Sequence, residues 1–395
     1  MDARENPYAP GAGTKPPALT GRDDEIEAFE IMLERLRRGA AGQSMILRGL
    51  RGVGKTVLLN TFEDLAVERD WLTVFKECEE STSLPGLVAR HCRRLIDDLG
   101  PGARVKRLLA SALDRLSTFT VVDPSGFEIR FELGRGKADP DSLSDDFTDL
   151  LVALGAAAEE RGRGVIFLLD EVQFLHPAEF GPFVVGLHRI NQKALPLTCV
   201  AAGLPSLPAL AGEAKSYAER LFTYPAIAHL DRRAADEALA RPAWARKVAF
   251  SQSALAAAYD RTKGYPYFIQ ELGKYTWNVA TGSRIDRGDV ARGWELASHA
   301  LDDGFFLVRF ERATPAERRV LRALAELDGP PYPIAALVRL LGKRSPRQLS
   351  VQRDSLIKKG LLFSPRHATL DFTVPLFADY LRRRFPSIDA VIGLG

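Results

Sequence analysis

Residues 43–56 read Gln-Ser-Met-Ile-Leu-Arg-Gly-Leu-Arg-Gly-Val-Gly-Lys-Thr. The first half is a short apolar run between polar residues, which is typical of a buried strand. The second half, from Gly49 to Thr56, matches the spacing G-x-x-x-x-G-K-[ST], and a helical pattern follows at residues 55–69. A strand, a glycine-rich turn and a helix in this order predict an α/β fold built on a parallel sheet.

The glycine-rich turn predicts a phosphate-binding loop. Glycines let the backbone curl so that successive N–H groups point at phosphates, and the helix N-terminus adds its positive end. Lys55 is expected to reach the β- and γ-phosphates, and the Thr56 hydroxyl is expected to bind Mg²⁺. The expected nucleotide contacts are Gly49, Leu50, Arg51, Gly52, Val53, Gly54, Lys55, Thr56 and Val57.

A second segment carries two acids. Residues 165–169 are a five-residue apolar strand, and Asp170 and Glu171 follow it directly. Acids at the carboxyl end of a central strand lie at the usual ligand edge of an open α/β sheet. We expect Asp170 to hold Mg²⁺ and Glu171 to polarise the attacking water as general base. The pair therefore predicts hydrolysis of a nucleoside triphosphate, with Glu171 and Lys55 as catalytic residues.

The remaining patterns extend this α/β reading. We expect further strands at 71–75, 197–202 and 226–230. Helices are expected at 20–37, 146–161 and 180–192, and at 85–116 with a break at residues 100–102. A capping residue, Thr20 or Asp23, is expected to start the first helix. Period-2 alternation on both sides of residues 123–126 predicts a β-hairpin inserted at 117–135. Between residues 232 and 300 we find only helical patterns.

The C-terminal quarter is basic. Residues 306–395 hold 16 Lys and Arg against 8 Asp and Glu, whereas the whole chain has a net charge of only +3. Such asymmetry indicates an anionic partner. The expected elements are helices at 315–327, 334–341, 346–359 and 375–384, with a short hairpin at 361–372.

These motifs together resemble AAA+ ATPases of the archaeal-type and initiator-like (origin-recognition-like) subgroup, over residues 19–385. Leu19-Thr20-Gly21-Arg22-Asp23 is similar to the box that lies near the adenine in that family. The resemblance implies ATP with Mg²⁺, a P-loop ATPase core and a helical lid with a winged helix. The implied division is a flexible arm (1–18), the core (19–231), the lid (232–305) and a winged-helix domain (306–395).

The chain departs from the family pattern at two places. The strand that carries sensor 1 ends in Ala202-Gly203-Leu204, with Ser206 as the nearest hydroxyl, and Tyr267 stands near the sensor 2 arginine. Gly264-x-Pro266 instead resembles the element of STAND-type signalling ATPases in which the proline, here Pro266, packs on adenine. These departures imply slow hydrolysis and a nucleotide that acts as a switch.

The segment 217–222 resembles the part of the family that carries an arginine finger, which here is Arg220. Such a residue stabilises charge in the transition state and can come from a neighbouring subunit, so it implies a homo-oligomer. The alternative is that Arg220 is a surface residue of a helix. The sequence does not decide between them.

The resemblance to a winged helix makes residues 346–359 the recognition helix. We expect Leu349, Val351, Leu356 and Ile357 to anchor it. The residues expected to meet double-stranded DNA are Arg347, Gln348, Gln352, Arg353 and Lys359, with Arg366 on the wing. Winged helices also contact protein. The inserted hairpin is equally open: Arg130, Arg135 and Lys137 could touch DNA or a neighbouring subunit, or the hairpin could be surface decoration.

Bulk features exclude other classes. No apolar run approaches the roughly 20 residues that span a bilayer, and the N-terminal residues lack the apolar stretch of a signal peptide. We therefore expect a cytoplasmic protein with no membrane partner. The leading hypothesis is an ATPase that couples nucleotide state to double-stranded DNA. The alternative is a STAND-like switch with slow ATPase activity whose winged helix meets a protein client.

Overall fold

The computed structural model describes residues 1–11, 13–79, 81–100, 102, 110, 120–122, 128–130, 140–205, 207 and 218–391. The chain divides into two compact units. One consists of Arg22–Gly49 and Lys55–Ile227, and the other of Met1–Gly21, Leu50–Gly54 and Ala228–Gly395. The further division into a lid and a winged-helix domain stays a prediction. Among the described residues, no helix is both long and apolar enough to cross a membrane.

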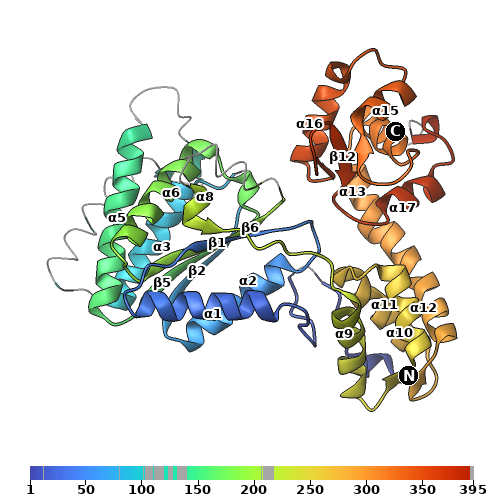
Figure 1. The fold of residues 1–395 in the computed structure, drawn as a ribbon, viewed down its shortest axis with the longest axis horizontal. Helices are drawn as coiled ribbons and strands as arrows, with labels where there is room; N and C mark the ends of the chain where they lie inside the picture. Colours follow the sequence, from blue (N-terminus) through green and yellow to red (C-terminus); the bar gives the residue numbers. More distant parts are fainter. Residues whose placement is uncertain are drawn as a thin grey trace. The chain divides into compact units, whose positions relative to one another are not determined.

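The first unit is built on a five-stranded parallel sheet (Figure 1). The strands are β2 (Trp71–Glu77), β5 (Gly164–Asp170), β6 (Leu197–Gly203), β1 (Ser44–Arg48) and β7 (Phe222–Thr223), in that spatial order. Strand β6 lies between β1, which leads into the glycine-rich loop, and β5, which ends in Asp170. This order confirms the predicted α/β P-loop fold, with an extra strand between those two.

Helices cover both faces of this sheet. They are α1 (Asp23–Arg37), α2 (Lys55–Glu68), α3 (Leu84–Leu99), α5 (Pro140–Glu160), α6 (Pro177–Gln192) and the short α8 (Ala218–Leu221). Figure 1 shows α1 and α2 on one side, and α3, α5 and α6 on the other. Phe29 of α1 stacks on Phe62 of α2 with ring centroids 4.1 Å apart. On the opposite face, Phe167 of β5 meets Phe183 of α6 edge to face.

Two details of this unit differ from the sequence prediction. Helix α1 starts after Arg22, which makes no side-chain capping hydrogen bond, so neither Thr20 nor Asp23 is the cap. The last strand is β7, and of the predicted stretch 226–230 only Ala226 bridges to the sheet, at Arg48. The physical reason is that β1 ends at Arg48, where the loop begins, so residues beyond Ile227 have no strand to pair with.

The predicted hairpin insertion is confirmed in its pairing. Strands β3 (Thr120–Val122) and β4 (Glu128–Arg130) are antiparallel, with Thr120 opposite Arg130. Arg135 and Lys137, which the sequence analysis singled out beside this hairpin, lie outside the described residues.

The second unit contains helices α9 (Arg232–Trp244), α10 (Gln252–Thr262), α11 (Pro266–Val279) and α12 (Arg287–Ala300). The expectation of helices alone was wrong, because β8 (Ala249–Phe250) pairs in parallel with β9 (Arg284–Ile285). A two-residue strand is fixed by its neighbour and leaves no periodic pattern.

The N-terminal residues pack on these helices. Tyr8 is buried and its hydroxyl donates to Leu239 O at 2.6 Å. Gly273 makes room for the ring, because a Cβ there would lie 2.6 Å from Tyr8 Cδ1. Trp277 Nε1 donates to Asp2 O at 2.9 Å. The flexible arm predicted for residues 1–18 is thus a packed segment at Asp2 and Tyr8, because burial of one aromatic ring outweighs the Pro- and Gly-rich composition.

The C-terminal part combines short helices with a three-stranded antiparallel sheet of order β10-β12-β11. Its elements are α13 (Leu307–Glu311), α14 (Pro315–Leu324), β10 (Tyr332–Pro333), α15 (Ile334–Leu340), α16 (Ser350–Lys358), β11 (Leu362–Phe363), β12 (Thr369–Phe372) and α17 (Phe377–Arg384). Stacked aromatic rings form its core, including Phe306 on Phe377 and Phe310 on Phe385.

The predicted helix 346–359 is split. A 3-10 turn occupies Pro346–Leu349, and α16 begins only at Ser350. Leu349 and Leu356 are buried whereas Val351 is 75% exposed, because residues i and i+7 share one face of a helix and residue i+2 lies on the opposite face. The prediction that Val351 anchors this helix to the core was therefore wrong.

Candidate functional site

The glycine-rich loop joins β1 to α2. Gly52 and Gly54 have φ angles of 77° and 99°, a region that side chains with a Cβ rarely adopt. The buried Lys55 begins α2, and its Nζ donates to Gly49 O at 3.0 Å. The first turn of α2 holds no acidic residue that would compete with an anion at the helix N-terminus.

The two motifs meet at the carboxyl end of the sheet. Thr56 Oγ1 in the first turn of α2 donates to Asp170 Oδ2 at 2.5 Å, at the end of β5. Asp170 is 2% exposed. Burial raises the pKa of this carboxyl, and the nearby Glu171 raises it further, while the Thr56 hydroxyl acts in the opposite direction. A hydroxyl and a carboxylate in contact form a pair of oxygen ligands that could hold a divalent cation.

Glu171 occupies a special backbone position. Its φ and ψ are 51° and 38°, in the left-handed region, and its N–H donates to Asp170 Oδ1 at 2.8 Å. Non-glycine residues in this region cluster at functional sites, where surrounding contacts hold them. The Glu171 carboxylate accepts a hydrogen bond from Gln173 Nε2.

Gln173 is the residue that the sequence analysis missed. It lies in the 3-10 turn η2 (Val172–Phe174), and its Oε1 accepts a hydrogen bond from Leu204 N at 3.3 Å. Leu204 directly follows β6, where the sensor 1 position offers no polar side chain. The sequence hinted at such a residue only through the missing polar side chain at the sensor 1 position, since no motif marks Gln173. Ser206, the nearest hydroxyl in sequence, lies outside the described residues.

The elements expected near the adenine come together within the second unit. A Cβ on Gly21 would lie 2.7 Å from Ala234 Cβ and 3.4 Å from Leu230 Cδ2. Leu230 N in turn donates to Gly264 O at 2.8 Å, two residues before Pro266. Gly21 and the Gly264–Pro266 segment thus both contact Leu230. Arg22, which belongs to the first unit, is buried, and burial lowers its pKa.

The tip of the loop packs on this segment. The fully buried Tyr265 donates from its hydroxyl to Arg51 O, and a Cβ on Gly52 would lie 2.4 Å from that hydroxyl. Tyr267, near the sensor 2 place, donates to Glu271 Oε1 at 3.0 Å. Burial raises the pKa of Tyr267 to about 12, so it stays a neutral hydroxyl at physiological pH.

Arg220 is exposed at the end of α8, and its backbone carbonyl accepts a hydrogen bond from Gln43 Nε2 at 2.7 Å. An exposed guanidinium fits an arginine finger and a plain surface residue equally well. Tyr217, at the start of the same segment, lies outside the described residues. The role of Arg220 stays a prediction.

The residues expected to meet DNA divide into two groups. Lys359 forms an ion pair of 2.6 Å with the buried Glu317, and Arg353 pairs with Asp354 at 2.8 Å. Arg347 and Arg366 are exposed. The ammonium of Lys359 therefore compensates a carboxylate that α14 buries, and its contact with DNA stays a prediction.

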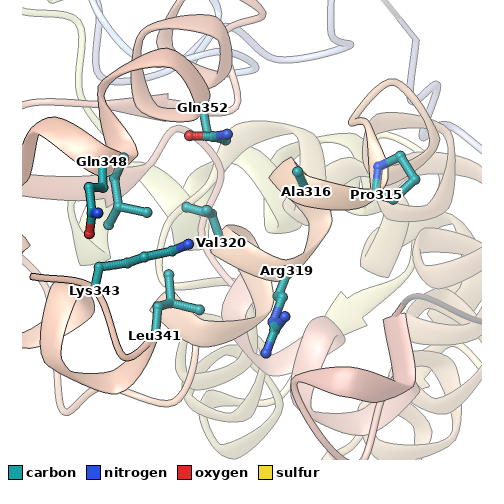
Figure 2. A pocket seen from close by; sticks show the side chains of 9 residues that line it. Pro315, Ala316, Arg319, Val320, Leu341, Lys343, Gln348 and Gln352 are labelled. Atoms are coloured by element: carbon teal, nitrogen blue, oxygen red, sulfur yellow. The ribbon is translucent and has the colours of Figure 1, made fainter.

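Gln348 and Gln352 line a cavity of about 260 Å³ (Figure 2). Gln348 Oε1 accepts a hydrogen bond from Arg344 N at 2.8 Å. The other lining residues are Pro315, Ala316, Arg319, Val320, Leu341, Lys343 and Leu349. The wall is mainly apolar, with two cations and two amides around it.

Comparison with known proteins supports the fold. The AAA ATPase domain family (AAA_16) matches residues 18–200. A domain of unknown function (DUF8462) matches residues 303–381. None of the curated proteins matches the chain by sequence. The family match supports nucleotide binding and ATPase activity at the level of the family.

A solved structure at low sequence identity shares the fold. The Walker-type ATPase PABY2304 of Pyrococcus abyssi aligns with a TM-score of 0.55 and 18% identity, over 92% of this chain and 96% of its own. The RuvB Holliday junction branch migration motor of Thermotoga maritima has a TM-score of 0.46 and 17% identity, over 94% and 99%. The Aeropyrum pernix ORC1 protein, solved with DNA, has a TM-score of 0.46 and 14% identity, over 95% of this chain and 94% of its own.

Proposed function

We propose that this chain binds ATP with Mg²⁺ and hydrolyses it to ADP and phosphate. The observation that carries the proposal is the 2.5 Å contact between Thr56 of the glycine-rich loop motif and Asp170 of the acidic strand end, with Glu171 next to it. Two motifs separated by more than 100 residues in sequence supply adjacent polar groups at one sheet edge. The AAA ATPase domain match over residues 18–200 includes both of them.

Each residue has a role that its chemistry suits. The backbone N–H groups of Gly49–Thr56 cradle the phosphates, and Lys55 neutralises charge on the β- and γ-phosphates. Glu171 accepts a proton from the water that attacks the γ-phosphorus, while the bond to the ADP oxygen breaks. Gly21, Arg22 and Pro266 are the proposed adenine contacts, each from the resemblance of its own segment.

The residues also suit a magnesium ion. Mg²⁺ prefers oxygen ligands and usually binds through one or two protein groups together with substrate phosphates. Thr56 and Asp170 offer that limited set, and the described residues contain no cluster of three or more His, Cys, Asp or Glu that would form a protein-only cage. When bound, the ion neutralises charge that develops on the phosphate oxygens.

Substitution of Glu171 by Gln tests the proposal. This variant should bind ATP as the wild type does and lose turnover by about 100-fold or more, because the amide cannot take up the proton. The matched control is Glu159→Gln, an exposed residue of α5, which should hydrolyse ATP at the wild-type rate. Wild-type turnover in Glu171→Gln would overturn the general-base assignment.

A second part of the proposal concerns the C-terminal elements. The order of helices and strands from α14 to β12 suits a winged helix with α16 as recognition helix. Exposed Lys343, Arg344 and Arg347 precede this helix in the sequence, and exposed Arg366 follows it. We infer that these cations meet the phosphates of double-stranded DNA and couple it to the nucleotide state. ATP turnover should then rise on addition of duplex DNA, and the stimulation should fade between low and moderate salt.

The contact between Tyr265 and Arg51 favours one alternative. The Tyr265 hydroxyl connects the Gly264–Pro266 segment to a backbone carbonyl at the tip of the nucleotide loop, and such a connection suits a STAND-like switch. In that case the purified protein should retain tightly bound ADP, its turnover should ignore DNA, and the partner of α16 should be a protein. A DNA-stimulated rate in nucleotide-free protein would exclude the switch.

We also propose that the chain forms a homo-oligomer in which Arg220 acts as an arginine finger. If this exposed guanidinium acts on the nucleotide of a neighbouring copy, specific activity should rise with protein concentration, and Arg220→Ala should remove that rise. A rate per chain that is independent of concentration would make Arg220 a surface residue.

A further inference from the structure

One side-chain amide connects the general base to a neighbouring strand. Gln173 donates from Nε2 to Glu171 Oε2, and its Oε1 accepts the backbone N–H of Leu204 at 3.3 Å. An amide has one donor end and one acceptor end, so only this orientation satisfies both partners. The Glu171 carboxylate is thereby tied to the carboxyl end of β6.

Gly203 provides the space for this amide. A Cβ on Gly203 would lie 2.4 Å from Gln173 Oε1 and 2.6 Å from Leu207 Cδ1. Even the smallest side chain at the end of β6 would therefore push the amide away. The polar group at this strand end comes from the turn η2, which follows Glu171, and the strand itself contributes only backbone.

We propose that Gln173 is a positioning residue for Glu171, and that it links the direction of the Glu171 carboxylate to the end of β6. The proposal rests on the hydrolysis proposed above. The left-handed backbone of Glu171 fixes where its side chain starts, and the Gln173 amide fixes where it ends. Catalytic groups need to be held within about 0.5 Å of their working position, so this second anchor has a kinetic consequence.

Removal of the amide should lower kcat without weakening ATP binding. We expect Gln173→Ala to reduce kcat by about 10- to 100-fold, since misplacement of a reacting group by about 1 Å costs a factor of that order. The ATP dissociation constant should change by less than about twofold, because Gln173 has no contact with the glycine-rich loop among its described hydrogen bonds.

Two further variants give the effect a chemical signature. Gln173→Glu removes the N–H donor and sets a second carboxylate beside Glu171, so its kcat should fall at least as far as that of Gln173→Ala. Gln192→Ala, an exposed residue at the end of α6, is the matched control and should keep the wild-type kcat. A wild-type kcat in Gln173→Glu would overturn the proposal.

A double-mutant cycle with Gly203 separates positioning from general destabilisation. Gly203→Ala should lower kcat by displacing the amide, and it should lower kcat no further in a Gln173→Ala background. Its clash with Leu207 remains in both backgrounds, so thermal stability should fall in both. Additive losses in kcat would overturn the proposal, because they would show that Gly203 acts by another route.

Glu171→Gln, measured in parallel, separates the failure of the hydrolysis assignment from the failure of the role proposed for Gln173. If that variant turns over ATP normally, the hydrolysis assignment itself fails. If Glu171→Gln is inactive and Gln173→Ala is normal, the hydrolysis assignment stands and the role of Gln173 is wrong.

Discussion

Charged and polar side chains are held differently in two regions of this protein. At the carboxyl edge of the central sheet, Thr56, Asp170 and Glu171 lie in one chain of hydrogen bonds, and Asp170 is 2% exposed. In the C-terminal part, cations are spread over several elements. Lys359 is bound to Glu317, whereas Arg347 and Arg366 are exposed.

This difference shows how much a motif and a charge count each encode. A motif with fixed spacing on a strand end and a helix start specifies which atoms meet, since both elements have a fixed geometry. An excess of Lys and Arg specifies only that a region is basic. Each cation then binds whichever carboxylate the fold brings near, as Glu317 of α14 does for Lys359.

The largest effect should come from the sheet edge. Lys55→Ala should weaken ATP binding by about 100-fold or more, because it removes the buried ammonium that we propose binds the phosphates. Equilibrium titration with a fluorescent ATP analogue measures the loss. The control Lys193→Ala removes an exposed lysine after α6 and should leave affinity unchanged. Equal affinities of Lys55→Ala and wild type would contradict the proposed loop function.

The C-terminal cations should show a smaller, salt-dependent effect. Replacing both Arg347 and Arg366 by Ala should weaken duplex DNA binding by about tenfold at low salt and lower the slope of log K against log salt by about 0.9 for each lost phosphate contact. Fluorescence anisotropy over a salt series measures both quantities.

Lys359→Ala is the matched comparison for that experiment. It should destabilise the protein, because it leaves the buried Glu317 unpaired, while the salt slope stays as in the wild type. If Lys359→Ala lowers the slope as much as the double variant, the division between paired and exposed cations is wrong.

Asp170 should carry a stability cost that depends on pH. Burial raises its pKa above the usual 3.8, so the folded state binds the proton more tightly than the unfolded state. The contribution of this carboxyl to stability is therefore present at low pH and is lost as pH rises through the raised pKa.

Without Mg²⁺ and nucleotide, Asp170→Asn should thus be more stable than the wild type at pH 7. The two should converge as pH falls below about 3.8, the usual value for this carboxyl. Urea unfolding over a pH series provides the measurement, and Asp97→Asn, an exposed residue of α3, is the control. A less stable Asp170→Asn at pH 7 would show that the buried charge is compensated.

The smallest effect tests which face of α16 is buried. Val351→Ser should change the free energy of unfolding by no more than about 0.5 kcal/mol, because Val351 is 75% exposed. Leu356→Ala, at a fully buried position of the same helix, should cost about 2–5 kcal/mol. Similar losses in the two variants would contradict the exposed position of Val351.

Much of the central sheet was predictable, because its strands are apolar runs with glycine or charged residues at their ends. The two-residue strands β7 and β8 escaped prediction, since a neighbouring strand defines them and no periodicity does. The start of α16 escaped as well. Pro346 suits the start of an α-helix and of a 3-10 turn equally, so the sequence does not show at which residue the α-helix begins.

For the candidate site, Lys55, Thr56, Asp170 and Glu171 were predictable because each belongs to a motif whose spacing has a chemical reason. Gln173 was not, because its role depends on the 3-10 turn and on the absent side chain of Gly203. The pairing of Lys359 was hidden for a similar reason: its partner lies 42 residues earlier in the chain. Contacts that long-range packing creates are invisible to a local pattern.

The central claim is that Thr56 and Asp170 bind Mg²⁺ together with ATP, and its most direct test is the ATP dissociation constant with Mg²⁺ and with EDTA. Mg²⁺ should tighten ATP binding by about tenfold or more in the wild type and by less than about twofold in Thr56→Val, which lacks the hydroxyl ligand. Thr61→Val on the same helix, whose hydroxyl donates to Val57 O at 2.9 Å, should behave as the wild type. An equal Mg²⁺ effect in wild type and Thr56→Val, or none in the wild type, would contradict the account.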